Sequence, residues 1–366
     1  MADIYKLFAS RLRERREELK MTQKQLAEAL GYSEKNVSKW ESGTSIAPSA
    51  VLPRLASILK TDVNFLLLDG DECYFLGIDG GGTKTEFALC NENGEIISSV
   101  TLEGVNPLDI GFAHARDILV KGISTVLGDK PTSSVYAFAG IAGGITGQNK
   151  DKIHDLLAGF GFADFNNGSD AENAVASALS DTDGTVVIMG TGTVAFTKTK
   201  NKLIRHGGWG YLFEYGGSGY SIGRDAILHA LSAEENGKED MLSTAISRNL
   251  GNTCLSSLAD LYNGGKRKIA SFTPIVFECF DNGDLISRQI LEKNMLAIAK
   301  LIESSANEST KNVVLTGGLV ERADVILPMI RAHLKKPSNY NLSVAKERQI
   351  FGAIRLAQKL KGEASC

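Results

Sequence analysis

A glycine-rich stretch at residues 79–85 combines residue types that can bind phosphate. It runs Asp79-Gly80-Gly81-Gly82-Thr83-Lys84-Thr85 and follows an apolar run at residues 74–78 that predicts a strand. Glycines after a strand let backbone N–H groups close on phosphate oxygens, because no Cβ is in the way. The Asp79 carboxylate can hold a metal ion. The candidate phosphate contacts are Gly81, Gly82, Thr83, Lys84 and Thr85.

Two more glycine turns follow strand-like runs further along the chain. The run at 185–189 leads into Gly190-Thr191-Gly192-Thr193, and the run at 312–315 leads into Thr316-Gly317-Gly318. A lone glycine turn is weak evidence, because such turns are common in loops. Three of them, each after a strand, predict two α/β lobes that converge on one ligand.

Asp170 is the candidate for proton transfer. Phosphoryl transfer depends mainly on positioning and charge neutralisation, but a carboxylate must accept the proton of the attacking hydroxyl. Asp170 lies where residues 166–170 lead into an alanine-rich helix at 171–179, so its short side chain can be aimed into a cleft. Ser-Asp before such a helix is also a common helix cap. Both interpretations stay open at this point.

Strands and helices alternate through residues 75–190, which predicts an α/β layer architecture. The expected strands cover 75–88 with a turn inside, 95–100, 135–139 and 185–189, and the expected helices cover 111–126, 149–160 and 171–179. Beyond residue 220 the pattern is mostly helical until the strand at 312–315. A last helix includes residues 352–357.

The composition indicates ordinary globular material. A length of 366 residues predicts two or three domains, and 43% of the residues are hydrophobic while 23% are charged. The five cysteines are widely spaced, which favours reduced thiols over a zinc site or a disulfide framework. The N-terminus lacks a signal-peptide pattern, and no apolar run is long enough to span a bilayer. We therefore expect a soluble, cytoplasmic protein with no membrane contact.

Residues 1–70 are slightly basic and have the pattern of short helices. They hold 11 Lys/Arg against 9 Asp/Glu, a net charge of +2, which leaves −5 for the rest of the chain. Apolar residues at helical spacing predict a first helix over 3–20. Thr22 and Gln25 predict a capping box at the start of a second helix.

Other boundaries in this region are marked by small or rigid residues. Gly31 should end the second helix, Ser33 should cap a third, and Pro48 should open a fourth. A short fifth helix is expected at 61–68 and a linker at 69–73. Short helices with a tight helix–glycine–helix turn match a helix-turn-helix bundle.

The string Thr22-Gln23-x-x-Leu26-Ala27, then Gly31, Trp40-Glu41-x-Gly43 and Pro48, is specific. It resembles the Cro and lambda-repressor type of helix-turn-helix domain. The resemblance implies an operator DNA partner and a dimer, because one helix reads too few base pairs. The implied DNA contacts are Gln23 on a phosphate and Glu34, Lys35, Asn36 and Lys39 on the recognition helix. The alternative is a protein-binding or relic domain.

A second set of motifs spans residues 75–360. Its members are Asp79–Thr85, Asn106-Pro107, Ala139–Gly144, Asp170-Ala171, Gly190–Thr193, Gly207–Gly210, Gly217–Gly223 and Thr316–Gly318. They resemble the superfamily of acetate and sugar kinases, heat-shock chaperone ATPases and actin. Within it they are most similar to the N-acetylglucosamine kinases and the related BadF/BadG/BcrA/BcrD ATPases.

This resemblance implies an all-α helix-turn-helix bundle followed by two α/β lobes of the ribonuclease H-like actin/sugar-kinase fold. It also implies ATP and Mg²⁺ as cofactors, with Asp79 positioning the metal and Asp170 acting as the catalytic base. The implied nucleotide contacts, beyond the first turn, are Gly190, Thr191, Gly192, Thr193, Gly317 and Gly318. The implied contacts to an amino sugar or related hexose are Asn106, Gly143, Gly144 and Ser218. Glu214 and Tyr215 are added to them, from a loop at 214–218 whose sequence differs from the family pattern.

One segment departs from the sugar-kinase pattern. After Gly-Trp-Gly the family usually carries Gly-Asp-Glu-Gly-Ser, whereas this chain has Glu214-Tyr215-Gly216-Gly217-Ser218. Tyr215 replaces the Asp that would bond sugar hydroxyls, and the site loses a strong acceptor. Glu214 lies one position earlier and substitutes for it if the loop shifts. Loop variation without consequence is the alternative to altered substrate choice or weak turnover.

We expect a helix-turn-helix domain at 1–70, an N-terminal kinase lobe at 74–190 and a C-terminal kinase lobe at 191–366. The favoured function is a sugar-responsive transcription regulator whose kinase-like domain binds ATP and phosphorylates an amino sugar. The alternatives are a sensor without turnover and a metabolic kinase with an incidental DNA-binding head. An activase with an iron–sulfur cluster is least favoured, because no cysteine lies beside a suitable glycine turn.

Two further groups carry less information. The five histidines are scattered without metal-ligand spacing. The basic triplet at 266–268 is most simply a solvated loop after the Gly264-Gly265 turn.

Overall fold

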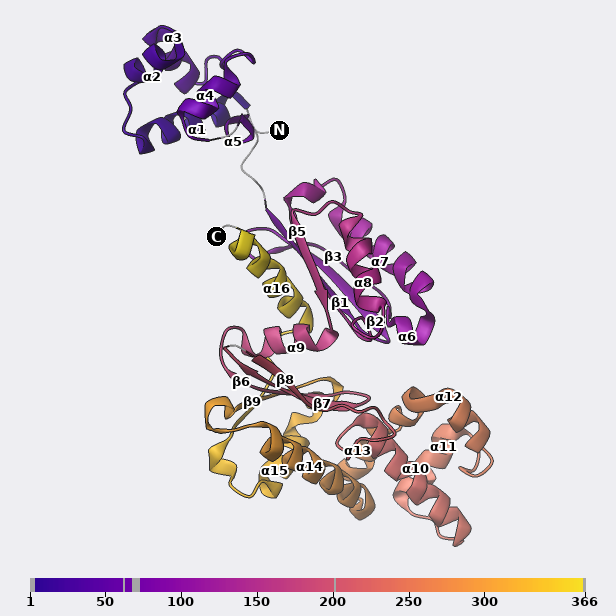
Figure 1. Cartoon of the computed structure of the whole chain (residues 1–366). Coiled ribbons are helices and arrows are strands. Elements are labelled where there is room, and N and C mark those ends of the chain that lie inside the picture. The colour runs from indigo at the N-terminus through magenta and orange to yellow at the C-terminus, as the bar shows by residue number, and fades with distance from the viewer. Residues whose placement is uncertain (1–3, 62, 68–72, 201, 365–366) are drawn as a thin grey trace. The chain divides into compact units, whose positions relative to one another are not determined.

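The computed structural model describes residues 4–61, 63–67, 73–200 and 202–364. The chain forms two compact units (Figure 1). One comprises Met1–Tyr74 with short pieces at 91–95 and 133–135, and the other comprises the remainder. Residues 69–72 of the expected linker, residues 62 and 68 of the expected fifth helix and residue 3 of the expected first helix lie outside the described residues.

The first unit is helical. Its helices are α1 (Ile4–Glu18), α2 (Gln23–Leu30), α3 (Glu34–Glu41), α4 (Leu52–Ile58) and α5 (Val63–Leu67). The capping box at Thr22 and Gln25 is confirmed. Gly31 ends α2 with φ 76°, a conformation that favours glycine. Ser33 occupies the N-cap position of α3, but its side chain makes no capping hydrogen bond.

The fourth helix does not begin at Pro48 as expected. Pro48 starts a turn instead, since its carbonyl accepts a hydrogen bond from the Val51 N–H at 2.8 Å. The helix begins at Leu52, and Pro53 takes one of its first two positions, where a missing N–H costs nothing.

Apolar side chains from all five helices form the core of this unit. Among them Phe8, Leu12, Leu26 and Val37 are almost fully buried. A buried ion pair ties α1 to α3, with Arg16 Nε 2.6 Å from Glu41 Oε1. Packing of this kind fixes α3 as a rigid element whose other face meets solvent.

The second unit contains two five-stranded sheets. The first has the order β3-β2-β1-β4-β5 and the second has the order β8-β7-β6-β9-β10. The strands are β1 (Tyr74–Gly80), β2 (Lys84–Cys90), β3 (Ile96–Glu103), β4 (Val135–Ile141), β5 (Asp164–Gly168), β6 (Gly184–Met189), β7 (Thr193–Thr199), β8 (Lys202–Gly207), β9 (Asn312–Thr316) and β10 (Asn341–Val344).

The two sheets share one topology. In each, an antiparallel three-stranded meander leads on to parallel strands. In the first sheet β1–β2 and β2–β3 are antiparallel and β4–β5 is parallel. In the second sheet β6–β7 and β7–β8 are antiparallel, and β6–β9 and β9–β10 are parallel. The glycine turns after β1 and β6 therefore occupy equivalent positions in the two lobes. The predicted two-lobed α/β architecture is confirmed.

Helices fill the rest of this unit. They are α6 (Pro107–Ile110), α7 (Phe112–Leu127), α8 (Asn149–Ala158), α9 (Asp170–Leu179), α10 (Gly219–Glu235), α11 (Met241–Leu250), α12 (Leu258–Ala270), α13 (Thr273–Asp281), α14 (Leu285–Ser305), α15 (Ala323–His333) and α16 (Gln349–Ala364). Figure 1 shows α9 beside α16, and these two helices are in extensive contact. No helix among the described residues is both long and apolar enough to cross a membrane.

Candidate functional site

The first glycine turn joins β1 to β2 and is held by backbone hydrogen bonds. The Gly81 N–H donates to the Lys84 carbonyl at 3.0 Å, and the Val105 N–H donates to the Gly81 carbonyl at 3.1 Å. Thr83 and Lys84 are exposed, so a phosphate from solvent can reach them. Thr85 differs from them, because it is fully buried and its hydroxyl donates to the Glu103 carbonyl at 2.8 Å.

Asp79 lies near the end of β1 and is oriented by an amide from α9. Asn173 Nδ2 donates to Asp79 Oδ1 at 2.9 Å, and the same nitrogen lies 3.1 Å from the Ile78 carbonyl. Burial raises the pKa of Asp79 to about 6; the Asn173 hydrogen bond opposes the rise and the nearby Asp170 carboxylate adds to it. Asp79 and Asp170 therefore belong to one electrostatic site.

Asp170 is the first residue of α9, but it does not cap that helix. Ser169 is the N-cap, and the Glu172 side chain accepts a hydrogen bond from the Ser169 N–H at 3.0 Å. Asp170 Oδ1 accepts a hydrogen bond from the adjacent Ala171 N–H at 3.0 Å. Burial raises the pKa of Asp170. A half-buried carboxylate that does not cap its helix is available for proton transfer.

The second glycine turn is anchored by the start of α10. The Gly219 N–H donates to the Gly190 carbonyl at 2.8 Å, and the Tyr220 N–H donates to the Thr191 carbonyl at 3.2 Å. Thr191 and Gly192 are exposed. Thr193 Oγ1 is buried and, within the described residues, has no hydrogen-bond partner. An unpaired hydroxyl in this turn fits the approach of a phosphate oxygen.

The third turn lies against the second. Gly317 has φ 100°, and a Cβ at this position would lie 2.5 Å from the Met189 carbonyl oxygen. Met189 directly precedes Gly190, so β9 brings the Gly317-Gly318 turn next to the second phosphate turn. Only glycine allows this approach, because the atoms in contact are backbone.

The expected sugar contacts Asn106 and Gly143 are brought together. A Cβ on Gly143 would lie 2.4 Å from Asn106 Oδ1, and Gly143 has φ 69°. The Asn106 side chain accepts from the Leu108 N–H at 3.0 Å and donates to Asp109 Oδ2 at 3.1 Å. Gly144 is held by a hydrogen bond from its N–H to the Ile141 carbonyl at 2.9 Å.

The departing loop at 214–218 is fixed from two sides. Glu214 Oε1 accepts a hydrogen bond from the Ser218 hydroxyl. Burial raises the pKa of Glu214, while Ser218 and the Thr193 N–H oppose the rise. On the other side Asn294 Oδ1 accepts from the Gly217 N–H at 2.9 Å. Tyr215 is 89% exposed. Glu214 thus faces the second phosphate turn, and Tyr215 projects away from the loop.

Three residues that the sequence analysis did not select take part in this arrangement. Asn173 and Asn294 are buried amides that bind Asp79 and Gly217, which lie 94 and 77 residues away in the sequence, so no local pattern marks them. Arg267 belongs to the basic triplet expected in a solvated loop, but it lies in α12. Its Nη2 atom is 2.8 Å from Asp109 Oδ2 and also donates to the Gly82 carbonyl. The only local signal for Arg267 was the basic run itself.

On the helical unit, the expected DNA contacts lie on the solvent face of α3. Glu34, Lys35 and Lys39 are exposed and Asn36 is half-buried, whereas Val37 and Trp40 point into the core. Gln23 lies on α2 instead of α3, and its Nε2 donates a hydrogen bond to Glu41 Oε2 at 2.8 Å. This bond orients the Gln23 amide at the first turn of α2.

Comparisons with protein families agree with this division of the chain. Residues 76–354 match the model of the BadF/BadG/BcrA/BcrD ATPase family, and residues 12–66 match a helix-turn-helix model. An N-acetylmuramic acid/N-acetylglucosamine kinase of Clostridium acetobutylicum is 29% identical over 78% of this chain and 98% of its own length. An N-acetyl-D-glucosamine kinase of Dictyostelium discoideum is 29% identical over 70% of this chain and 88% of its own length.

The N-terminal part and the fold have relatives as well. An uncharacterized HTH-type transcriptional regulator of Sinorhizobium medicae is 29% identical over 31% of this chain and 76% of its own length. The structure of a candidate N-acetylglucosamine kinase from Chromobacterium violaceum has a TM-score of 0.64 at 20% identity, covering 79% of this chain and 100% of that one. A glucokinase of the ROK family from Streptomyces griseus has a TM-score of 0.52 at 17% identity, covering 78% and 98%.

These matches confirm both resemblances found in the sequence and the actin/sugar-kinase fold. The two curated relatives of the larger unit are named as kinases of N-acetylated amino sugars. The chain therefore belongs to the BadF/BadG/BcrA/BcrD ATPase family and carries a helix-turn-helix domain before its ATPase domain.

Proposed function

We propose that this protein is a sugar-responsive transcription regulator whose ATPase domain transfers the γ-phosphate of ATP to a hydroxyl of an amino sugar. The helix-turn-helix domain at 1–70 binds operator DNA as a dimer, and the lobes at 74–190 and 191–366 bind ATP and the sugar. The amino-sugar class is supported by the Clostridium and Dictyostelium relatives, which are named as kinases of such sugars.

The observation that carries the kinase part is the pairing of Asp79 with Asp170 beside the first glycine turn. Both carboxylates are half-buried and both have raised pKa values, and the charge of Asp170 acts on Asp79. Two carboxyl groups that interact electrostatically, but have different neighbours, suit different tasks. The Asn173 hydrogen bond keeps Asp79 oriented, whereas Asp170 has an oxygen left for a substrate proton.

The chemical step follows from these positions. Asp170 accepts the proton of the attacking sugar hydroxyl as the new bond between oxygen and phosphorus forms. The bond from the γ-phosphorus to the bridging oxygen breaks, and ADP leaves. Backbone N–H groups of the first and second glycine turns, with Thr83 and Thr191, hold the phosphates in line, because positioning supplies much of the rate in phosphoryl transfer.

The donor set near the first turn suits Mg²⁺. Mg²⁺ binds one or two protein carboxylates and completes its shell with water and substrate phosphates. Asp79 would hold it, and the ion would neutralise charge on the phosphates. The unpaired Thr193 hydroxyl offers a donor on the other side of the same ligand.

The regulator part is supported by α3, which presents Lys35 and Lys39 to solvent on a rigid helical unit. The relative from Sinorhizobium medicae is named as a transcriptional regulator. A dimer follows from half-site geometry, because a single recognition helix reads few base pairs. Ligand-dependent closure of the kinase lobes would change the spacing of two heads only if the ligand binds the two conformations unequally.

A second candidate is a sensor that binds ATP and sugar without turnover. The observation in its favour is Tyr215, whose side chain is 89% exposed at the position where the sugar-kinase pattern has an acid. A metabolic kinase with an incidental head is the third candidate.

The deciding experiment is to incubate the protein with Mg-ATP and a panel of hexoses and amino sugars and to follow ADP release. Release with one sugar, abolished in Asp170→Asn, supports kinase chemistry. Silence across the panel with sugar binding retained supports the sensor. Absence of binding to any DNA upstream of its own gene would refute the regulator.

A further inference from the structure

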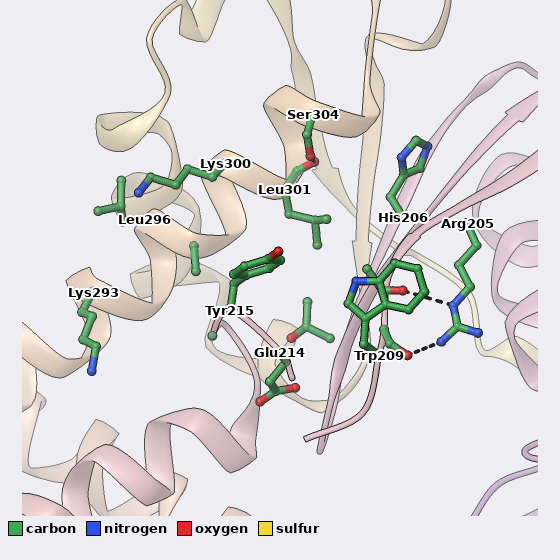
Figure 2. A pocket seen from close by; sticks show the side chains of 15 residues that line it. Arg205, His206, Trp209, Glu214, Tyr215, Lys293, Leu296, Lys300, Leu301 and Ser304 are labelled. Atoms are coloured by element: carbon green, nitrogen blue, oxygen red, sulfur yellow. Dashed lines mark hydrogen bonds between the residues drawn. The ribbon is translucent and has the colours of Figure 1, made fainter. Parts of the chain in front are cut away.

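A cavity of about 720 Å³ lies in the C-terminal lobe between α14 and the end of β8 (Figure 2). Its floor is apolar and includes Leu296, Ala297 and Leu301. The loop that carries Glu214 and Tyr215 forms one wall. Thr193, from the second phosphate turn, also lines this cavity, so it adjoins the site proposed for phosphoryl transfer.

The lining has an excess of positive charge. Arg205 comes from β8, and Lys293 and Lys300 come from α14 (Figure 2). Glu214 is the one carboxylate among the described lining residues, and it already accepts hydrogen bonds from Ser218 and the Thr193 N–H. A sugar hydroxyl that enters this cavity therefore finds cationic donors instead of a second carboxylate acceptor.

The three cations differ in how far they are neutralised. Lys293 Nζ pairs with Asp225 Oδ2 at 2.9 Å. The Arg205 guanidinium donates to the Gly207 carbonyl at 3.2 Å and to the Gly208 carbonyl, and both acceptors are uncharged. Lys300 Nζ has no ion-pair or hydrogen-bond partner within the described part of the chain. Arg205 and Lys300 thus carry charge that no protein carboxylate balances.

Two aromatic side chains also line this cavity. Trp209 is 64% exposed and Tyr215 is 89% exposed, which is unusual for rings of this size. The Arg205 guanidinium lies 5.9 Å from the centre of the Trp209 ring, so the cation and the ring form one surface. Exposed rings beside cations are typical of a site that holds an amphipathic ligand with a negative group.

We propose that this cavity selects an amino sugar that carries an anionic substituent, a carboxylate or a phosphate, with Lys300 as its principal charge partner. Trp209 and Tyr215 contact the apolar face of the sugar, and Arg205 adds to the positive field. The inference rests on the proposed function, because it names the class of sugar that the same lobe binds.

The test is to titrate the full chain, without ATP, with three probes. They are N-acetylglucosamine (neutral), N-acetylmuramic acid (carboxylate) and N-acetylglucosamine 6-phosphate (phosphate). Binding is followed by calorimetry and by tryptophan emission, since Trp209 at the cavity and Trp40 in the helical core are the two tryptophans of the chain. Tighter binding of the carboxylate probe indicates an acidic substrate, and tighter binding of the phosphate probe indicates a phosphorylated effector.

We expect one anionic probe to bind roughly tenfold more tightly than the neutral sugar, since a charge-assisted hydrogen bond adds about this much. The advantage should shrink at high salt. Lys300→Met should reduce affinity for that probe to the level of the neutral sugar and leave the neutral sugar unchanged. Lys300 is exposed, so the variant should fold. Lys121→Met, a change of an equally exposed lysine on α7, is the control and should have no effect.

Equal affinity for neutral and anionic probes would overturn this inference and leave the proposed function in place. An anionic preference that survives Lys300→Met would also overturn it, because the charge would then be recognised elsewhere. Absence of binding by all three probes, together with absence of ADP release across the sugar panel, would overturn the proposed function as well.

Discussion

At the scale of single residues, the site combines carboxylates whose ionised form is disfavoured by burial with a hydroxyl that lacks a hydrogen-bond partner among the described residues. Asp79 and Asp170 are half-buried carboxylates with raised pKa values, and Thr193 Oγ1 is a buried hydroxyl without a partner among the described residues. Each costs stability in the ligand-free chain. Such costs gather where a protein binds a charged ligand, so these residues are where substitutions separate function from stability.

Asp170→Asn should reduce sugar-dependent ADP release at least about 100-fold, because a general base contributes roughly that factor or more. Asn keeps the shape and the acceptor for the Ala171 N–H, so sugar affinity should change little. ADP release and sugar binding are measured on the same preparation. Asp155→Asn, on the exposed face of α8, serves as the control. Unchanged release in Asp170→Asn would remove this residue from the chemistry.

Asp79→Asn should stabilise the metal-free protein at neutral pH. Below pH 3.8 the carboxyl is protonated in the folded and unfolded chains alike. Between 3.8 and about 6 the folded chain keeps a proton that the unfolded chain has released, so stability falls as pH rises through this window. The variant avoids that loss, which amounts to at most about 3 kcal/mol for a shift of about two pH units.

The measurement is urea unfolding of both proteins in EDTA at pH 4 and pH 7. The variant's advantage should be larger at pH 7 than at pH 4. An equal difference at the two pH values would mean that the ionisation of Asp79 does not carry the effect.

At the scale of elements, α14 positions the loop at 214–218 through one buried amide. Asn294 accepts from the Gly217 N–H and from the Ser221 hydroxyl, and its Nδ2 donates to Asp225 at 3.2 Å. Asn294→Ala leaves the Gly217 N–H buried without a partner, at a cost of about 1–3 kcal/mol. Urea unfolding should detect this loss of stability. The protein should also bind sugar more weakly, because the loop is no longer held in place. Asn236→Ala, at an exposed helix end, should lie within about 0.5 kcal/mol of the native protein.

Sequence patterns predicted the elements that carry the glycine turns, because a buried strand followed by glycines is a strong local signal. They did not mark β5, β7, β8 or β10 as strands. β8 is mostly exposed and mixes Lys202 and Arg205 with apolar residues, and β10 has four residues. The predicted start of α4 was wrong because Pro48 and Pro53 both suit the first turn of a helix. Only the hydrogen bond from the Val51 N–H to the Pro48 carbonyl, which closes a turn before the helix, decides between them.

The side-chain partnerships of the site lay beyond any sequence pattern. Asn173 meets Asp79 across 94 residues, and Arg267 meets the Gly82 carbonyl across 185. Such pairs depend on how the sheets and helices pack. The sequence could name Asp79 and Asp170 as carboxylates of interest, but it could not tell that Ser169 caps α9 and leaves Asp170 available.

At the scale of the whole molecule, the helical unit should bind DNA with an affinity that falls as the salt concentration rises. Lys35→Ala or Lys39→Ala should weaken binding to the operator, since each removes a cation from the exposed face of α3. If the lysine binds a DNA phosphate, its removal should reduce the slope of log affinity against log salt by about one. Fluorescence anisotropy at several salt concentrations measures both the affinity and the slope. Lys60→Ala, an exposed lysine outside α3, is the matched control.

A regulator must couple its two ligands in both directions. If the sugar, with ATP, changes operator affinity by some factor, the operator must change sugar affinity by the same factor, and such factors commonly lie between about 5 and 150. Operator affinity is measured by anisotropy with and without the sugar, and sugar affinity by calorimetry with and without operator, at one salt concentration. We expect equal factors above about 5. A protein that binds both ligands tightly, yet shows no change in either titration, would be a kinase whose DNA-binding head acts independently of its substrate.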